Sequence, residues 1–326
     1  MQPIIFEVHT RIMGHGHSRC NVSLWALPAL LVYLVAGIAQ PPEADHPSTA
    51  QELIDGIKGF ERSAGLPQAR SFEQESNTVK SYYRCYYTGP LELPESYDGL
   101  KLRQGSETGC GMDPRKYDVF FYALQAAGSG KTPLTSALAR SSVERILVVV
   151  PHEDYHARKA LPATIGEAVA TLAGFVTAAN YARGQFGAES RVYHNLSLEP
   201  ELFLKKSAIV NRYYADLRKV YDRLQSRQIT SPMAFAMKGR LFEQLRSECD
   251  AINPNPTSFN KSVSAYNNAG LAFDRTYTQY YPLIYELFES RRLDLKLTID
   301  ALDRALNEQK LSEQRAVAKI RSLIDE

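Results

Sequence analysis

The pattern His-Glu-x-x-His at residues 152–156 constrains this chain more than any other feature of its sequence. In an α-helix, His152 and His156 lie one turn apart on the same face, with about 5–6 Å between their Cβ atoms. Both imidazoles can then reach one metal ion at about 2.0–2.1 Å, and Glu153 can act on a water bound to the same ion. The motif therefore predicts a helix that carries a metal site.

Glu167 is the candidate third ligand. It lies in the apolar stretch 163–179, which we expect to form a second helix after a turn at Leu161-Pro162. A buried carboxylate needs a cation or a hydrogen-bond partner, because leaving it unpaired is costly. Two histidines and a carboxylate are a common ligand set for one hydrolytic Zn²⁺ ion. Small residues in this stretch would allow a neighbouring helix to approach closely: Ala168, Ala170, Ala173 and Gly174.

Several stretches together resemble a known bacterial family. They are Tyr117-Asp118-Val119, Pro133-Leu134, Leu138-Ala139, His152-Glu153-Asp154-Tyr155-His156, Gly166-Glu167-Ala168-Val169-Ala170-Thr171, Phe242-Glu243-Gln244-Leu245-Arg246 and Asn267-Asn268-Ala269 with Tyr277, Pro282 and Leu287 beyond it. The family is that of the putative aminopeptidases, and the similarity runs over roughly residues 50 to 290.

The resemblance implies a zinc peptidase in which His152, His156 and Glu167 bind the metal and Glu153 is the general base. Its substrates would be peptides or proteins. Pro151 before the first histidine, Gly166 where the family pattern has Asn, and a short spacer to Glu167 depart from that pattern. A catalytically degenerate relative that binds peptides is therefore the alternative.

The expected fold is mainly helical (α+β) and zincin-like, with a small sheet beside the active-site helix and a helical C-terminal half. Aromatic and β-branched residues predict strands at 82–87 and 119–124, and the Gly- and Pro-rich stretch 88–114 predicts a loop between them. We divide the mature chain into a catalytic region at 40–190, a helical region at 191–290 that completes it, and one long amphipathic helix at 291–326. This last helix could pair with a partner chain.

Apolar spacing of three and four residues predicts the remaining helices. Residues 133–150 suit either a helix or a strand that ends at Val150, because three valines run into Pro151. The other expected helices are 49–64, 202–224, 234–252, 263–277 and one that starts at Pro282.

The N-terminus predicts export. Polar and basic residues precede a nearly continuous apolar run at 24–39, and small residues at 37–39 suit cleavage by a signal peptidase. Sixteen residues are short for a membrane span, which needs about 20. We therefore expect residues 1–39 to be a cleaved export signal, which would place the protein in the periplasm or outside the cell. An uncleaved inner-membrane anchor is the alternative.

Net charge and cysteine content narrow the kinds of partner and of metal site that the chain can have. A net charge of +2 without a basic cluster makes nucleic acid an unsuitable partner. Four cysteines, one of them in the expected leader, exclude a four-cysteine zinc site in the mature chain. Cys85 and Cys110 could form a disulfide in an oxidising compartment, although free buried thiols fit the sequence equally well.

A second motif points to nucleotide binding. Residues 128–132 read Gly-Ser-Gly-Lys-Thr and follow an expected strand, as in a phosphate-binding loop. Gln125 stands at the position where the full pattern needs its first glycine, and without that glycine the backbone amides cannot wrap a phosphate easily. We keep this interpretation as a disfavoured third function and expect a loop and helix cap instead.

Three further residues are candidates for binding the substrate or its transition state. Tyr277 could stabilise the oxyanion that forms when water attacks a peptide carbonyl. Asn267 and Asn268 could bind the substrate backbone, although capping a helix is the more common use of such residues.

Overall fold

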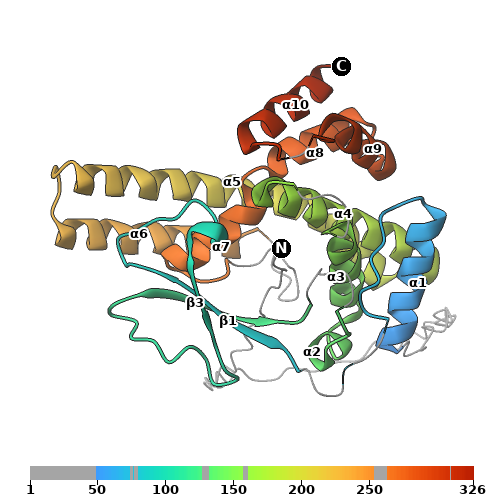
Figure 1. Ribbon diagram of the computed structural model, residues 1–326, viewed down its shortest axis with the longest axis horizontal. Coiled ribbons are helices and arrows are strands. Elements are labelled where there is room, and N and C mark those ends of the chain that lie inside the picture. The colour runs from blue at the N-terminus through green and yellow to red at the C-terminus, as the bar shows by residue number, and fades with distance from the viewer. Residues whose placement is uncertain are drawn as a thin grey trace, which may run out of the picture.

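The computed structural model describes residues 49–73, 76, 80–126, 132–156, 161–252, 263–308 and 310–326. The predicted export signal or anchor at 1–39 lies outside these ranges, as do residues 128–131 of the glycine-rich loop. In the described ranges, no helix has both the length and the apolar character needed to span a bilayer. The chain is mainly helical, with one small sheet (Figure 1).

The sheet has three antiparallel strands in the order β2-β1-β3. β1 (Tyr82–Thr88) and β3 (Asp118–Leu124) confirm the two predicted strands. The loop prediction for 88–114 was wrong in part, because this segment contains β2 (Lys101–Gln104) and the short 3₁₀-helix η1 (Tyr97–Gly99). All four residues of β2 are exposed, so pairing with β1 forms this strand and no apolar alternation announces it. Cys85 and Cys110 form a disulfide that closes the same region.

α1 (Ala50–Ser63) forms as the sequence predicts. Thr49 caps it in a capping box, in which its hydroxyl accepts from the Glu52 amide and the Glu52 carboxylate accepts from the Thr49 amide. Leu53, Ile54 and Ile57 are buried, and α1 packs against the third helix, α3 (Val143–His156).

Residues 136–139 and 143–150 are helical, so the interpretation of this stretch as a strand that ends at Val150 was wrong. The short helix α2 (Ser136–Ala139) precedes α3 (Val143–His156), and the hydroxyl of Ser142 accepts from the Arg145 amide in the first turn of α3. Pro151 lies inside α3 and lacks an amide to donate to Leu147. The valines at 148–150, directly before Pro151, are all buried in the core.

α4 (Ala163–Phe186) packs along α3. The approach is closest at Gly174, where a Cβ atom would lie 2.8 Å from the carbonyl oxygen of Val148 and 3.2 Å from the Cβ of His152. The small residues of this stretch therefore do permit close helix packing. The contact seats α4 directly against the turn that carries the first histidine.

α5 (Arg191–Gln225) and α6 (Ser231–Asp250) form a long antiparallel hairpin that projects from the rest of the molecule (Figure 1). α7 (Asn268–Thr278) begins five residues later than predicted, because Asn267 caps it. Its Phe273 packs on the aromatic face of the sheet, with ring centroids 4.7 Å from Phe120 and 5.1 Å from Tyr122. α7 therefore joins the sheet to the helical body.

The predicted single helix at 291–326 was wrong. After α8 (Tyr281–Ser290), the chain forms α9 (Leu295–Ala305) and α10 (Glu313–Asp325), which are capped by Asp294 and Ser312. The apolar residues that suggested pairing with another chain belong to this chain's own core: Leu295, Ile299, Leu302, Leu306 and Ile320. Glu313 fixes α10 by accepting from Thr164 of α4 at 2.6 Å and from Tyr280 at 2.7 Å. Whether the chain also forms an oligomer stays a prediction.

Candidate metal centre

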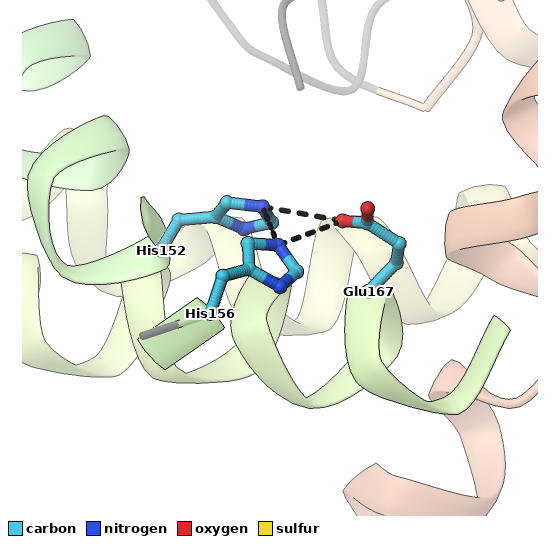
Figure 2. Close-up of side chains that lie close together, drawn as sticks. All are labelled: His152, His156 and Glu167. Carbon is cyan, nitrogen blue, oxygen red and sulfur yellow. Dashed lines mark hydrogen bonds and ion pairs between the residues drawn. The ribbon is translucent and has the colours of Figure 1, made fainter. Parts of the chain in front are cut away.

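The three predicted ligands meet at one point, where α3 lies against the start of α4 (Figure 2). One carboxylate oxygen of Glu167, Oε2, lies 3.1 Å from Nε2 of His156 and 3.3 Å from Nε2 of His152. The two Nε2 atoms are themselves 3.1 Å apart. Helical spacing places the histidines one turn apart, and the packing of the two helices supplies the carboxylate.

These separations fit a single small metal ion. Two ligand atoms at 2.0–2.1 Å from zinc, at the tetrahedral angle, are about 3.3–3.4 Å apart. The three distances of 3.1, 3.1 and 3.3 Å lie just below that value. Nitrogen and carboxylate donors with this spacing suit zinc, and three protein ligands leave a fourth position for water or substrate.

The charges at the cluster respond to burial and to one another. Burial lowers the pKa of His152 to about 4, against the raising effect of a hydrogen bond from its ring to Glu167. Burial also acts to lower the pKa of His156, but the charge of Glu167 outweighs it and raises the value to about 8. The histidines in turn hold the pKa of Glu167 at about 2, despite a burial that acts to raise it. Near neutral pH, the cluster therefore contains one neutral imidazole, one imidazolium and one carboxylate.

Tyr97 of η1 orients the carboxylate ligand. Its hydroxyl donates to Oε1 of Glu167 at 3.2 Å, which leaves Oε2 directed at the histidines. Burial, followed by the negative charge of Glu167, raises the pKa of Tyr97 far above its ordinary value, so the hydroxyl remains a donor. Sequence reasoning missed this residue, because it stands among turn-forming residues where no periodicity marks it as buried.

Glu153 follows His152 on α3 and is completely buried. Its negative charge contributes to the raised pKa of His156 and also acts on the buried Arg145, which lies eight residues earlier on α3. Burial lowers the pKa of Arg145 to about 10. Glu153 is therefore near the ligand cluster, as the motif predicts, in a setting that excludes bulk water.

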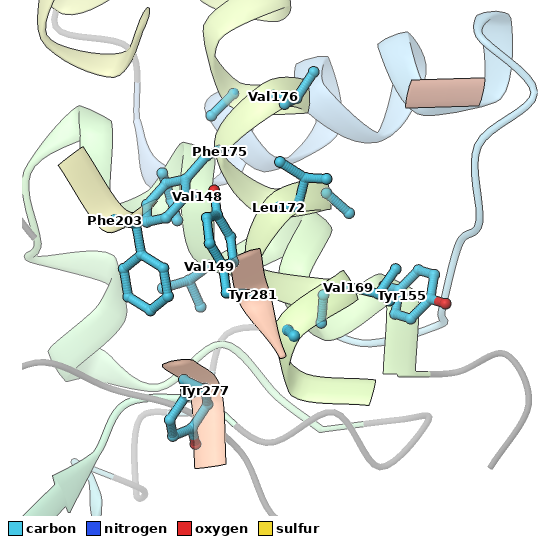
Figure 3. Packing of buried hydrophobic residues seen from close by; sticks show 14 of the residues in the cluster. Val148, Val149, Tyr155, Val169, Leu172, Phe175, Val176, Phe203, Tyr277 and Tyr281 are labelled. Atoms are coloured by element: carbon cyan, nitrogen blue, oxygen red, sulfur yellow. The ribbon is translucent and has the colours of Figure 1, made fainter. Parts of the chain in front are cut away.

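Tyr277 lies on α7 and is one of the buried residues labelled in Figure 3. Its ring centroid is 6.4 Å from that of Tyr97. Burial, followed by the charge of Glu167, raises its pKa well above the ordinary value, so the side chain is a neutral phenol. Its hydroxyl is buried and makes no hydrogen bond in the described part of the chain. A buried hydroxyl in that state has a donor to offer to a ligand.

The two predicted asparagines are used inside the protein. The Asn267 side chain accepts from the Gly270 amide and donates to the carbonyl of Val119. The Asn268 side chain accepts from the hydroxyl of Tyr221 and donates to the carbonyls of Pro90 and Glu92. The geometry supports a structural role for both, and substrate binding by either stays an untested prediction.

Comparison with known proteins relates this architecture to one family. Comparisons with curated proteins and with solved structures found no match for the chain. The model of the family described as "Putative aminopeptidase" matches residues 115–317, which include both helices of the candidate metal centre and more than half of the 326 residues. The chain belongs to this putative aminopeptidase family.

Proposed function

We propose that this protein is a zinc-dependent peptidase with a zincin-like catalytic domain. The observation that carries the proposal is the convergence of His152, His156 and Glu167 within 3.1–3.3 Å of one another in a buried site. Membership of the family supports a peptidase, and the chemistry of the three donors supports zinc as its metal.

Zinc held by these three side chains would lower the pKa of a water and polarise a substrate carbonyl. In this proposal, Glu153 accepts the proton from the attacking water and returns it to the leaving amine. Its place next to His152 and its complete burial support that role, because a base in a dry site near the reacting atoms needs no rearrangement of solvent.

Tyr277 is our candidate for stabilising the oxyanion. Its hydroxyl is protonated, buried and without a hydrogen-bond partner among the described residues, and it belongs to the aromatic group around Glu167. A donor prepared in this way costs little to align when negative charge develops on the substrate.

The substrates we propose are peptides from which the enzyme removes N-terminal residues, as the name of the family suggests. We also propose that residues 1–39 direct export, which would place the reaction in the periplasm or outside the cell. The Cys85–Cys110 disulfide is consistent with an oxidising compartment.

The first experiment measures metal. The full-length chain, purified without chelators, is compared with His156→Ala and with His194→Ala by elemental analysis. His194 is exposed on α5 and serves as the matched control. We expect about one zinc per chain in the wild type and in His194→Ala, and none in His156→Ala. A folded wild-type protein that holds no metal even after zinc is added would contradict the proposal.

The second experiment separates a peptidase from a degenerate peptide-binding relative. Wild type and Glu153→Gln are assayed on a library of short peptides, with zinc content as the control. We expect hydrolysis by the wild type and a loss of about 10²- to 10⁴-fold in Glu153→Gln, with the metal retained. Zinc binding without any hydrolysis would favour the degenerate relative, and equal activities would exclude Glu153 as the base.

A further inference from the structure

In η1, a buried residue that contacts the ligand cluster is followed directly by an exposed one. Tyr97 is buried and donates to Glu167, whereas Asp98, the next residue, is exposed. Backbone contacts fix this turn: the Tyr97 amide donates to the hydroxyl of Thr276 on α7 at 2.9 Å, and the Leu100 amide donates to the Tyr97 carbonyl at 3.0 Å. The position of Asp98 is therefore set by its neighbours and not by contacts of its own side chain.

The charge of Asp98 acts on the buried groups of the site. Burial is the main reason that the pKa of Tyr97 is raised, and the negative charges of Glu167 and Asp98 add to it. The same two carboxylates contribute to the raised pKa of Tyr86, which burial brings to about 12. Burial, together with the charge of Glu167, also raises the pKa of Asp98 itself. These effects are consistent with the position of Asp98, one residue from Tyr97, whose hydroxyl donates to Glu167.

Asp98 has no partner for its charge in the described part of the chain, where its carboxylate makes no hydrogen bond and no ion pair. Glu95, three residues earlier on the same loop, already pairs with Arg218 at 3.3 Å. Asp98 is thus an exposed carboxylate, one residue from the contact of Tyr97 with Glu167, and it is free to bind a cation from a ligand as far as the described residues go.

A peptide with a free N-terminus brings such a cation. Its α-ammonium lies within one residue of the first peptide carbonyl, and one residue spans at most about 3.6 Å. The group that binds the ammonium must therefore come from an element next to the ligand cluster, and Tyr97 anchors η1 to that cluster. We propose that Asp98 binds the α-ammonium of the substrate and so makes the site selective for free N-termini. This inference rests on the proposed peptidase function.

Equilibrium binding tests it without relying on turnover. The zinc-loaded full-length protein is titrated calorimetrically with leucine hydroxamate and with N-acetyl-leucine hydroxamate, which share the metal-binding group and differ in the free amine. We expect the wild type to bind the free amine about 10- to 100-fold more tightly, as a hydrogen-bonded charge pair would allow. Asp98→Asn should bind the two compounds with similar affinity, while Glu95→Gln keeps the wild-type ratio.

The possible results distinguish a failure of the metal site from a failure of the amine-binding proposal. If neither compound binds the wild type, the metal site and the proposed function fail, and the role of Asp98 fails with them. If both bind the wild type equally, the metal site stands and only the amine proposal is overturned. If Asp98→Asn keeps the wild-type ratio, Asp98 is not the amine-binding group. Zinc content and far-ultraviolet circular dichroism of each variant show that the fold and the metal are retained.

The same variants give a kinetic readout. On peptides with a free and an acetylated N-terminus, the ratio of the two kcat/KM values should fall by about 10- to 100-fold in Asp98→Asn. A merely structural role would lower both values together and leave the ratio unchanged.

Discussion

α3 carries buried ionisable residues on two opposite faces. The two faces differ in the partners that their charged groups have. The metal face holds His152 and His156, opposite Glu167 of α4. The α1 face holds Asp154, which is about 200° round the helix from His152. Asp154 contacts the ammonium group of Lys58 through both carboxylate oxygens, at 2.6 and 2.9 Å.

On the α1 face, each charged group has a partner suited to it. Lys58 also donates to the carbonyl of Ala69 at 3.0 Å. Glu61 is hydrogen-bonded to Asp154, and burial, followed by the charge of Asp154, raises the pKa of Glu61 to about 9. Glu61 is therefore neutral near pH 7, and the face as a whole holds one positive and one negative charge. This arrangement joins α1 to α3 and needs no ligand.

On the metal face, three donor atoms point at one position, and two of them are imidazole nitrogens 3.1 Å apart. A proton can bridge only part of such a cluster, whereas one divalent cation can bind all three atoms. The comparison teaches that burial of ionisable residues does not by itself identify a site. A site is identified when the lone pairs of several donor atoms converge on one point.

The largest effect is expected on the α1 face. Lys58→Met leaves Asp154 buried without its cation, and breaking a buried ion pair in this way costs about 3–5 kcal/mol. Denaturant unfolding in the presence of a chelator measures the loss. Lys219→Met is the control, because Lys219 forms an exposed pair with Asp216 and should cost no more than about 1 kcal/mol.

The zinc affinity of folded Lys58→Met completes this test. If the α1 face is purely structural, the affinity stays within a few-fold of the wild-type value. A stable Lys58→Met protein with a large loss of zinc affinity would reverse our assignment of the two faces.

The second effect is smaller and belongs to the metal face. Tyr97→Phe removes the hydrogen bond to Oε1 of Glu167 but keeps the ring in its aromatic group. Loss of such an outer-shell partner should weaken zinc binding by about 10- to 100-fold. Competition with a chromogenic chelator measures the change. Tyr83→Phe is the matched control, because Tyr83 stacks on Phe121 of the sheet and does not contact the ligands. An unchanged affinity in Tyr97→Phe would show that α4 alone orients Glu167.

Sequence could identify the metal face because its signal is local. The spacing of His152 and His156 fixes both on one side of any helix, and the apolar surroundings of Glu167 require a partner for its charge. The α1 face also has a signal in the sequence, in the spacing of its charged residues. Lys58 and Glu61 follow Ile54 by four and seven residues, so helical spacing places them on the buried side of α1, where charged residues are unusual.

Other features depend on contacts that no local pattern records. Tyr97 reaches Glu167 from 70 residues earlier in the chain, and its position depends on Thr276 of α7. β2 forms by pairing and has no buried residue to mark it. The break in 291–326 is different, because Ser312, which caps α10, is a local signal that the apolar periodicity obscured. Short-range spacing was therefore sufficient to predict the helix that carries His152 and His156. Tyr97 and β2, in contrast, are placed by tertiary contacts.

The smallest effect concerns protons at the metal face. Zinc binds deprotonated ligands, so binding must release whatever protons the metal-free ligands hold. The pKa values of about 4 for His152 and about 2 for Glu167 mean that neither ligand carries a proton at pH 6. The pKa of His156, raised to about 8 mainly by the charge of Glu167 against the effect of burial, means that this imidazole does.

We therefore expect zinc binding at pH 6 to release about one proton from the ligands, all of it from His156. Because zinc must displace one proton from His156 at any pH well below its raised pKa, zinc affinity should drop about tenfold per pH unit from pH 7 to pH 5. The dependence should level off above pH 8, where His156 is already neutral. Calorimetric titration in buffers of different ionisation enthalpy counts the protons. Release of two would mean that His152 is also charged, and release of none would mean that Glu167 does not hold His156 in its protonated form. Either result would change the charges assigned to the metal-free cluster, in which one imidazolium and one carboxylate lie beside a neutral imidazole near pH 7.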